Sequence, residues 1–448
     1  MELVVTLLIF ALLIVGIRKK VDLKALLLGE TFLILLFLTV IKGSVLGDST
    51  TGNSFLDCIS YIGNYFSSNI GGTVLSIIIV SAYVEVMNVL DATNKLAQLI
   101  RIPMKKVKNP YAIIVIVMLI TGLLRTCITS GPAAVLLVMA TFYPVMISCG
   151  CTPAASCTAI LIANALCWGP ADPIALAASQ LMSIEVNMTE WFVGVQLLIF
   201  VIFFAVMIIV YQITARINDR KEAFVVDQVQ ADQAECTVPV LYAILPLLPL
   251  VFMLIFSPFL ISTITIDINT ACLLSLLITL IFVLVSSREL TSLVKIIQKF
   301  FDSFGDVLKS LGIVVLLAMM FATCLNSIGG MQIIAGVLTG LNIPPVLLIL
   351  LICIFAGVIN IVVGSFIGAL SIAEPIAATV ASATGLNAPL ICFLVILACG
   401  AGCACSPVNP MVLVLNKRVP AGKLIKNGVV AVWSGAIVAI IAGCLILG

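Results

Sequence analysis

The chain has 448 residues, of which 62% are hydrophobic and only 9% are charged, and its formal net charge is +2. A mean hydropathy of +1.31 excludes an ordinary soluble globular protein, and the nearly balanced charge gives no reason to expect a nucleic acid partner. Apolar stretches long enough to cross about 30 Å of hydrocarbon recur along the sequence. The sequence therefore predicts an all-α, polytopic membrane protein whose surroundings are the lipid bilayer.

The predicted membrane spans follow one another along the whole chain. In order they are 1–17, 24–41, 70–90, 153–183, 190–213, 239–257, 261–285, 306–326, 388–416 and 427–447, with two further apolar regions at 110–148 and 344–384. The first span carries Glu2 in place of a basic start and is followed by Arg18, Lys19 and Lys20, which is typical of a membrane anchor and not of a cleaved signal.

Basic residues in the connections predict the orientation. The connections rich in Lys and Arg are 18–24, 91–109, 214–238, 286–305 and 417–426, whereas 42–69, 258–260 and 327–343 hold only Lys42 between them. Because cytoplasmic loops carry the excess of Lys and Arg, the first set is expected inside and both termini outside.

The two halves of the sequence resemble each other. The stretch "NVLDATNKLA" at 88–97 aligns with "NSIGGMQIIA" at 326–335, and Ser130, Gly150 and Cys157 align with Ser365, Gly385 and Cys392 at near-constant offsets of 235 to 238 residues. Five basic residues lie in 91–109 and none in the counterpart 327–343, so equivalent segments are expected on opposite sides of the membrane.

These patterns predict two repeats of inverted topology. The first is expected at 1–213 and the second at 239–448, joined by a cytoplasmic linker at 214–238, the longest polar stretch. Secondary transporters use this architecture, and they bind substrate near the midplane where the repeats meet.

Each repeat contains a polar interruption between two apolar runs. The first is Thr129-Ser130-Gly131-Pro132 in the region 110–148, where Ser130 could cap a helix that begins at Pro132. The region could form two full spans or a re-entrant hairpin, and we favour the hairpin because its polar tip would then lie at midplane. The region 344–384 contains the equivalent interruption at Gly364 and Ser365, with Gly368 as a further small residue.

Each repeat also contains a predicted broken helix. "GPADP" at 169–173 interrupts the span 153–183, and "SPVNP" at 406–410 interrupts the span 388–416. Two prolines three residues apart cannot both occupy a continuous helix without a large cost in free energy. The free carbonyl groups and N–H groups at such breaks suit a cation and a carboxylate respectively.

Ionisable side chains at membrane depth are costly and are candidates for function. Asp172 is the preferred ligand for a coupling cation or proton, with a structural helix cap as the alternative. Arg125 could form a bidentate pair with a substrate carboxylate, or a structural pair with Asp172 or Glu374. Glu374 could line the cavity or lie near its outer mouth. Asn164 could be a ligand or a helix-bridging amide.

The remaining members of the predicted ion-coupling set are Gly169, Ser406 and Asn409, which complete the two breaks. No cofactor is expected beyond a sodium ion, and the oligomeric state is open, with a homodimer as one option. The absence of histidine from the sequence leaves proton coupling to Asp, Glu or water. Fifteen cysteines lie mostly inside apolar runs, where helix packing is the simplest interpretation.

Functions other than a secondary carrier of small carboxylates fit the sequence less well. The sequence has no HExxH, no catalytic histidine and no Walker A motif, so neither an enzyme nor a nucleotide-driven pump is expected. A carrier of another organic anion or of an amino acid remains open. A sodium–proton antiporter also remains open, although it would need neither Arg125 nor exposed N–H groups at the hairpin tips.

Several motifs resemble those of a known family. They are "KLAQLIRIPMKKVKNPYAI", "TSGPAAVLLVMATFYPVMISCGCTPAA" and "GPADPIALAASQ" in the first half, and "NSIGG", "GSFIGALSIAEP", "GLNAP" and "SPVNPMVLVLN" in the second. Together they make most of the chain similar to the DcuC-type anaerobic C4-dicarboxylate carriers of the ion transporter superfamily.

The resemblance implies a bacterial inner-membrane carrier of succinate, fumarate, malate or a related acid, working by symport with protons or sodium, by exchange or by efflux. It also implies paired hairpins and broken helices that move against a scaffold. By position, Thr129, Ser130 and Gly131, with Gly364 and Ser365, would contact substrate or ion. Arg125 and Gly131-Pro132 differ from the Ser/Ala-rich tip that the family leads us to expect.

Overall fold

The computed structural model describes the chain apart from residues 1, 20, 43–50, 105, 106, 108, 127, 129, 130, 220–237, 257–263, 265, 288, 331, 332, 334–343, 365 and 448. Every regular element in the described part is a helix, which confirms the all-α prediction.

The helices of the first half are α1 (Glu2–Arg18), α2 (Leu23–Lys42), α3 (Ser54–Asn69), η1 (Ile70–Val74), α4 (Leu75–Val89), α5 (Ala92–Met104), α6 (Pro110–Leu124), α7 (Gly131–Thr141), α8 (Tyr143–Ser148), α9 (Pro153–Ala163), α10 (Pro173–Leu181), α11 (Met188–Trp191), η2 (Phe192–Gln196) and α12 (Leu197–Asp219). Helix α12 thus extends six residues into the segment predicted as a linker.

The helices of the second half are η3 (Val240–Leu247), α13 (Leu248–Ile255), α14 (Ile268–Ser287), α15 (Leu290–Val307), η4 (Leu308–Gly312), α16 (Ile313–Ile328), α18 (Pro345–Val363), α19 (Phe366–Thr384), α20 (Ala388–Ala404), α21 (Pro410–Leu415) and α22 (Ala421–Ile446). Three short elements, η1, η2 and η4, are single π-helical turns, and η3 is a 3₁₀ helix.

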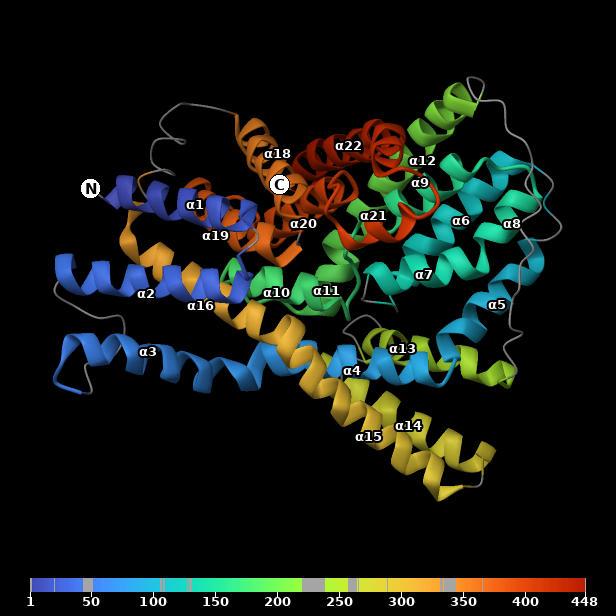
Figure 1. Cartoon of the computed structure of the whole chain (residues 1–448), viewed down its shortest axis with the longest axis horizontal. Helices are drawn as coiled ribbons and strands as arrows, with labels where there is room; N and C mark the ends of the chain where they lie inside the picture. The colour runs from blue at the N-terminus through green and yellow to red at the C-terminus, as the bar shows by residue number, and fades with distance from the viewer. Residues whose placement is uncertain are drawn as a thin grey trace.

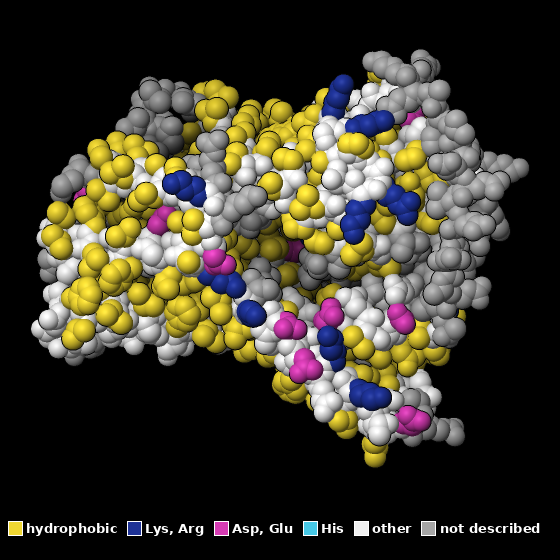
Figure 2. Space-filling model, viewed as in Figure 1, with side chains coloured by type: hydrophobic (Ala, Val, Ile, Leu, Met, Phe, Trp, Pro, Cys, Tyr) yellow, Lys and Arg dark blue, Asp and Glu magenta, His cyan; other side chains and the backbone are white. Residues whose placement is uncertain are grey.

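Length and composition identify the membrane-crossing helices. Five described helices are long and apolar enough to cross a bilayer: Leu23–Ile41, Met188–Asp219, Ile268–Ser286, Pro345–Val363 and Ala421–Ile446. The other apolar helices are 10–17 residues long, and several of them are the shorter pieces produced by interruptions of the chain. Apolar side chains also cover much of the outer surface in Figure 2, as expected where lipid replaces water.

Recurrent capping residues explain where many helices begin. Asn109, Thr152, Asp172 and Asn409 each directly precede a proline, and the side chain of each accepts a hydrogen bond from a backbone N–H of the following helix. The cap satisfies an N–H that has no partner inside the helix, and the proline occupies a position where its missing N–H costs nothing.

Three segments predicted as connections contain helices. Helix α3 lies in 42–69 and α5 in 91–109, and α15 begins in 286–305 and ends at Val307, so these connections are largely helical and not loops. These helices are amphipathic and too polar to be recognised as spans. In α15 the residues Ile296, Phe300 and Ser303 form one buried face, a helical spacing of four and three.

Two pairs of helices are continuous through a π-helical turn. Helices α3 and α4 are joined through η1, and α15 and α16 through η4, with no loop between the partners. In Figure 1, α15 and α16 form a long diagonal element that passes α4, and α15 packs along α4. A separate buried cluster, which includes Tyr83, Tyr242 and Phe300, holds α4, η3, α14 and α15 together.

The other helices surround the interrupted segments. Helix α12 packs along α22, α18 along α20, and α19 against both α18 and α20. In Figure 1, α9, α20, α21 and α22 lie together, with α6, α7 and α8 beside them and α10 beneath. Every side chain from Leu390 to Ala404 on α20 is buried, so α20 is the central helix of this group.

Candidate functional site

The first interruption is a tight turn after α6. Helix α6 ends at Leu124, Arg125 caps it, and α7 begins at Gly131. The predicted tip residues Thr129 and Ser130 lie outside the described residues. Arg125 is only 3% exposed. Its guanidinium donates to the Ile128 carbonyl at 2.5 Å and to Cys167 Sγ at 3.1 Å, so it fixes the turn to the first broken helix.

The first broken helix is interrupted between α9 and α10. Asp172 caps α10, and its Oδ1 accepts from the N–H groups of Ile174 at 2.8 Å and Ala175 at 3.0 Å. Its Oδ2 has no hydrogen-bond partner in the described part of the chain, although the residue is only 1% exposed. The positive charge of Arg125 acts on this carboxylate. Asp172 is therefore both a cap and a carboxylate with one oxygen available.

Gly169 shapes the same interruption. Its φ of +120° is rarely adopted by residues with a side chain, and an added Cβ would lie 3.5 Å from the side chain of Thr126. The neighbouring Trp168 donates its indole N–H to the Gly122 carbonyl at 3.1 Å, and its ring stacks on Phe200. The first break thus packs against both α6 and α12.

The second turn follows α18. Helix α18 ends at Val363, and Gly364 caps it with φ +67°. An added Cβ on Gly364 would lie 2.6 Å from Val408 Cγ2 and 3.1 Å from Ser406 Oγ, so only glycine fits against the second break. Ser365 lies outside the described residues.

The second broken helix is interrupted between α20 and α21. Asn409 caps α21 by accepting from the Met411 N–H at 2.8 Å, and its amide donates to Cys403 Sγ at 2.7 Å and to the Gly364 carbonyl at 3.3 Å. Ser406 is fully buried, and its hydroxyl has no hydrogen-bond partner within the described ranges. Asn409 thus occupies the capping position that Asp172 occupies in the first break, but without a charge.

The two turns and the two breaks converge. Asn164, at the end of α9, donates to the Gly131 carbonyl at 2.8 Å and to Met411 Sδ at 3.0 Å, which joins the first turn to the second break. The second turn meets that same break at Val408. Segments more than 200 residues apart in the sequence therefore meet at the 406–411 region.

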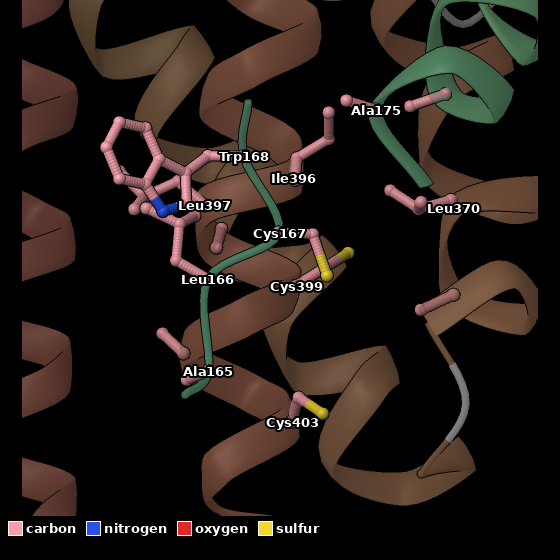
Figure 3. Close-up of a cluster of buried hydrophobic side chains, with 14 of the residues drawn as sticks. Ala165, Leu166, Cys167, Trp168, Ala175, Leu370, Ile396, Leu397, Cys399 and Cys403 are labelled. Atoms are coloured by element: carbon pink, nitrogen blue, oxygen red, sulfur yellow. The ribbon is translucent and has the colours of Figure 1, made fainter. Parts of the chain in front are cut away.

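The unwound segment of the first break lies along α20. An added Cβ on Gly400 would lie 2.7 Å from the Ala165 carbonyl, so the two backbones are in close approach. Figure 3 shows Ala165 to Trp168 running beside α20, with the thiols of Cys167 and Cys399 next to each other. The thirteen cysteines of the described residues are all free thiols, as expected for residues that fill packing positions.

Known proteins resemble this chain in both sequence and fold. The family model of the C4-dicarboxylate anaerobic carrier, DcuC, matches residues 1–447. The chain belongs to this family. The carrier is therefore a membrane transport protein and not an enzyme.

Relatives and solved structures agree with this assignment. The carrier is 22% identical to the anaerobic C4-dicarboxylate transporter DcuC of Escherichia coli K12, covering 98% of this chain and 96% of that protein. It is also 22% identical to the probable anaerobic C4-dicarboxylate transporter DcuC of Vibrio cholerae, covering 89% and 87%.

Two solved transporters share the fold. The YdaH transporter of Alcanivorax borkumensis superposes with a TM-score of 0.62 at 14% identity, covering 94% of this chain and 98% of that one. MtrF of Neisseria gonorrhoeae superposes with a TM-score of 0.66 at 14% identity, covering 95% and 96%. The family and these folds confirm a polytopic transporter architecture.

Two further predicted residues lie in α19. Glu374 is fully buried in α19 beside the Cys392 thiol, and neither of its oxygens accepts a well-formed hydrogen bond within the described residues. Gly368 lies one turn into α19, and its carbonyl accepts from the Ser371 hydroxyl at 2.9 Å. Both positions predicted for Glu374, lining the cavity or near its outer mouth, stay predictions.

The sequence analysis missed several residues of the site. Gln196, fully buried in η2, accepts a hydrogen bond from the Gly169 N–H at 2.9 Å. Cys167 and Met411 receive the hydrogen bonds of Arg125 and Asn164. Gln196 and Gln212 are the two glutamines inside the apolar run 190–213, and a polar side chain there was a recognisable signal. The two sulfur contacts depend on three-dimensional packing and left none.

The site offers two kinds of chemistry. At the turns and breaks, the oxygens without a partner among the described residues include Asp172 Oδ2, Asn164 Oδ1 and Ser406 Oγ, together with Asn360 Oδ1 near the end of α18. Oxygen atoms are the ligands of hard cations. The helices α7, α10 and α21 begin at the site with the positive ends of their dipoles. Asp172 and Asn409 already accept from the first N–H groups of α10 and α21, so the N-terminus of α7 is the one that suits an anion. No cluster of three or more His, Cys, Asp or Glu that could hold a metal occurs in the described residues.

Proposed function

We propose that the carrier is a secondary active transporter of C4-dicarboxylates, coupled to protons or sodium and working by alternating access. The family and the relatives support the substrate class. The convergence of both turns on the 406–411 region supports the position of the site.

The convergence is the single observation that carries the proposal. Gly131 is joined through Asn164 to Met411, and Gly364 packs against Val408. Backbone outside regular helices is tolerated within a bilayer only where protein or a water-filled cavity surrounds it. Four interruptions gathered in one place are therefore best explained by a binding site.

The dicarboxylate would bind at the helix N-termini. The N-termini of α7 and α21 belong to the first turn and the second break, which lie together. One carboxylate would bind the N–H groups at the start of α7. The second would lie against the second break, where Asn409 already accepts from the Met411 N–H and the Ser406 hydroxyl has no partner among the described residues. Thr129, Ser130 and Ser365 remain predicted contributors of further donors.

The charges of the site support co-transport of cations. Arg125 and Asp172 have formal charges of opposite sign, so the pair contributes no net charge when both are ionised. The two negative charges of the substrate must then be balanced by helix dipoles and by protons or sodium ions. Asp172 is the ligand we assign to this cation, because one of its oxygens is not used by the cap.

Alternating access would move the site relative to a frame. The cluster around Tyr83, Tyr242 and Phe300 is a core of its own, separate from the core that surrounds α20. We assign the frame to α4, η3, α14 and α15, and the moving part to the helices around the two breaks.

The test is transport by the purified carrier in proteoliposomes. Uptake of labelled succinate would be measured with an inward sodium gradient, with a proton gradient and with neither, and in competition with fumarate, butyrate, citrate and aspartate. We expect gradient-driven succinate uptake that fumarate inhibits and butyrate does not. Sodium-driven proton flux without any organic acid, together with no dicarboxylate uptake or exchange, would replace the proposal with the antiporter.

A further inference from the structure

A glutamine outside both breaks is connected to Asp172. Gln196 lies in η2 and its side chain is fully buried. Its Oε1 accepts from the Gly169 N–H at 2.9 Å, and the Gly169 carbonyl in turn accepts from the Asp172 N–H at 3.3 Å. Two consecutive hydrogen bonds therefore lead from Gln196 to the backbone of Asp172.

The chemistry of these bonds fixes the orientation of the amide. Gly169 contributes a backbone N–H, which can only donate, so the atom of Gln196 that faces it must be the oxygen. The amide nitrogen faces the other way, and it is buried without an acceptor in the described part of the chain. An unpaired buried donor destabilises the folded state, so an apolar side chain would be favoured here if packing were the only requirement.

Gly169 needs such a partner because it lies outside any helix. Helix α9 ends at Ala163 and α10 begins at Pro173, so the Gly169 N–H has no helical acceptor. Glycine also loses more backbone conformational entropy on folding than other residues, so neighbouring contacts must hold Gly169 at its positive φ. The π-helical turn η2 supports this interpretation, because such turns often occur at functional sites.

The second break has a comparable contact. Trp433 of α22 lies against the Cys405 thiol, at the end of α20. The sequence separation between Trp433 and Cys405 is nearly the same as that between Gln196 and Gly169. A helix that follows each break thus places one side chain on the unwound segment, but only in the first break does that side chain connect to a charged residue.

We infer that Gln196 is a positioning residue, which holds the turn from Gly169 to Asp172 so that Oδ2 of Asp172 keeps its place in the transport site. This inference rests on the proposed function for the importance of Asp172. The physical claim, that Gln196 keeps the first break closed, does not depend on any substrate.

The experiment measures opening of the break at a native cysteine. Cys167 lies two residues before Gly169 and is 2% exposed. Cys392 is fully buried inside helix α20, before the second break. Labelling by a membrane-permeant maleimide, resolved by mass spectrometry of peptides, reports opening of the break at Cys167 and of the whole fold at Cys392. Half-saturation by the coupling ion in the uptake assay gives a second readout.

The variants separate the hydrogen bond from packing. Gln196→Met keeps the size but loses the acceptor, and Gln196→Glu keeps an acceptor. Gln212→Leu is the matched control, because Gln212 on α12 also bonds a backbone group, the Tyr111 carbonyl, away from the break. We expect Gln196→Met to label Cys167 about tenfold faster, as the loss of one buried hydrogen bond implies, with Cys392 unchanged.

In Gln196→Glu and Gln212→Leu the labelling rate of Cys167 should stay within about twofold of the rate in the unmodified carrier. This change is smaller than the one expected when the hydrogen bond to Gly169 is lost. An unchanged rate at Cys167 in Gln196→Met, or equal acceleration at Cys167 and Cys392, would overturn the inference. If Gln196→Met does not insert into the membrane, Gln196→Asn replaces it, because the shorter side chain moves the amide carbonyl away from the Gly169 N–H. The same faster labelling of Cys167 is then expected. Labelling needs no substrate, so a failure of the carrier to move dicarboxylates would reject the proposed function and leave this result standing.

Discussion

The substitution Asp172→Asn separates the two roles of this residue. Oδ1 of Asp172 caps α10 through two hydrogen bonds, and in the second break the asparagine Asn409 occupies the equivalent capping position with one. Asparagine and aspartate are equally good caps. The substitution therefore removes the charge and retains the cap.

The structure gives the expected sizes of the effects. Because the cap is retained, the free energy of unfolding should change by less than about 0.5 kcal/mol, whereas Asp172→Ala should lose about 1 kcal/mol with the cap. A contact with a charged group is worth about 1.5–3 kcal/mol, so half-saturation by the coupling ion should require a concentration about 10- to 150-fold higher in Asp172→Asn.

The assay combines thermal unfolding of the purified variants with succinate uptake at varied sodium concentration and pH. The matched control is Asn409→Asp, which adds a charge at the equivalent cap. An Asp172→Asn variant with unchanged ion dependence would remove Asp172 from the coupling mechanism. A variant as unstable as Asp172→Ala would contradict the separation of cap from charge.

Two further substitutions test the turns. Arg125→Lys cannot make the planar double donation of arginine, so it should lower the affinity for succinate and narrow the difference between fumarate and butyrate as competitors of succinate uptake. An unchanged difference would argue against a substrate role. Gly364→Ala should lower stability by about 1–2 kcal/mol from its φ alone. It should lose more through the 2.6 Å contact with Val408. Gly385→Ala, at φ +69° with nothing within 4 Å, isolates the first contribution, and equal melting temperatures for the two variants would refute the close contact.

The breaks were predictable because their chemistry is local. Paired prolines in "GPADP" and "SPVNP" cannot continue a helix, and Asp172 and Asn409 directly precede a proline that suits the first turn of one. The resulting caps appear in the structure at those residues. The inverted topology of the repeats, by contrast, stays a prediction that rests on the charges of the connections.

Other features depended on distant parts of the chain. The amphipathic helix α15 is too polar to be recognised as a span, and its buried face is explained only by packing on α4. For Arg125 a pair with a substrate carboxylate, or with Asp172 or Glu374, stays a prediction, whereas its hydrogen bonds to Ile128 and Cys167 were not foreseen. Sequence alone could not reveal these partners, because Cys167 lies more than 40 residues farther along the chain.

Protection of the second break by substrate tests the site most directly. Val408 is 50% exposed and contacts the second turn, so a Val408→Cys variant should react with a water-soluble maleimide, and Ser382→Cys on the exposed end of α19 provides the control. We expect saturating succinate to slow labelling at 408 at least fivefold, roughly what occupancy of a site implies, with butyrate ineffective and position 382 unaffected. Labelling at 408 that proceeds at the same rate with and without succinate, in a carrier that transports succinate, would contradict the location of the site.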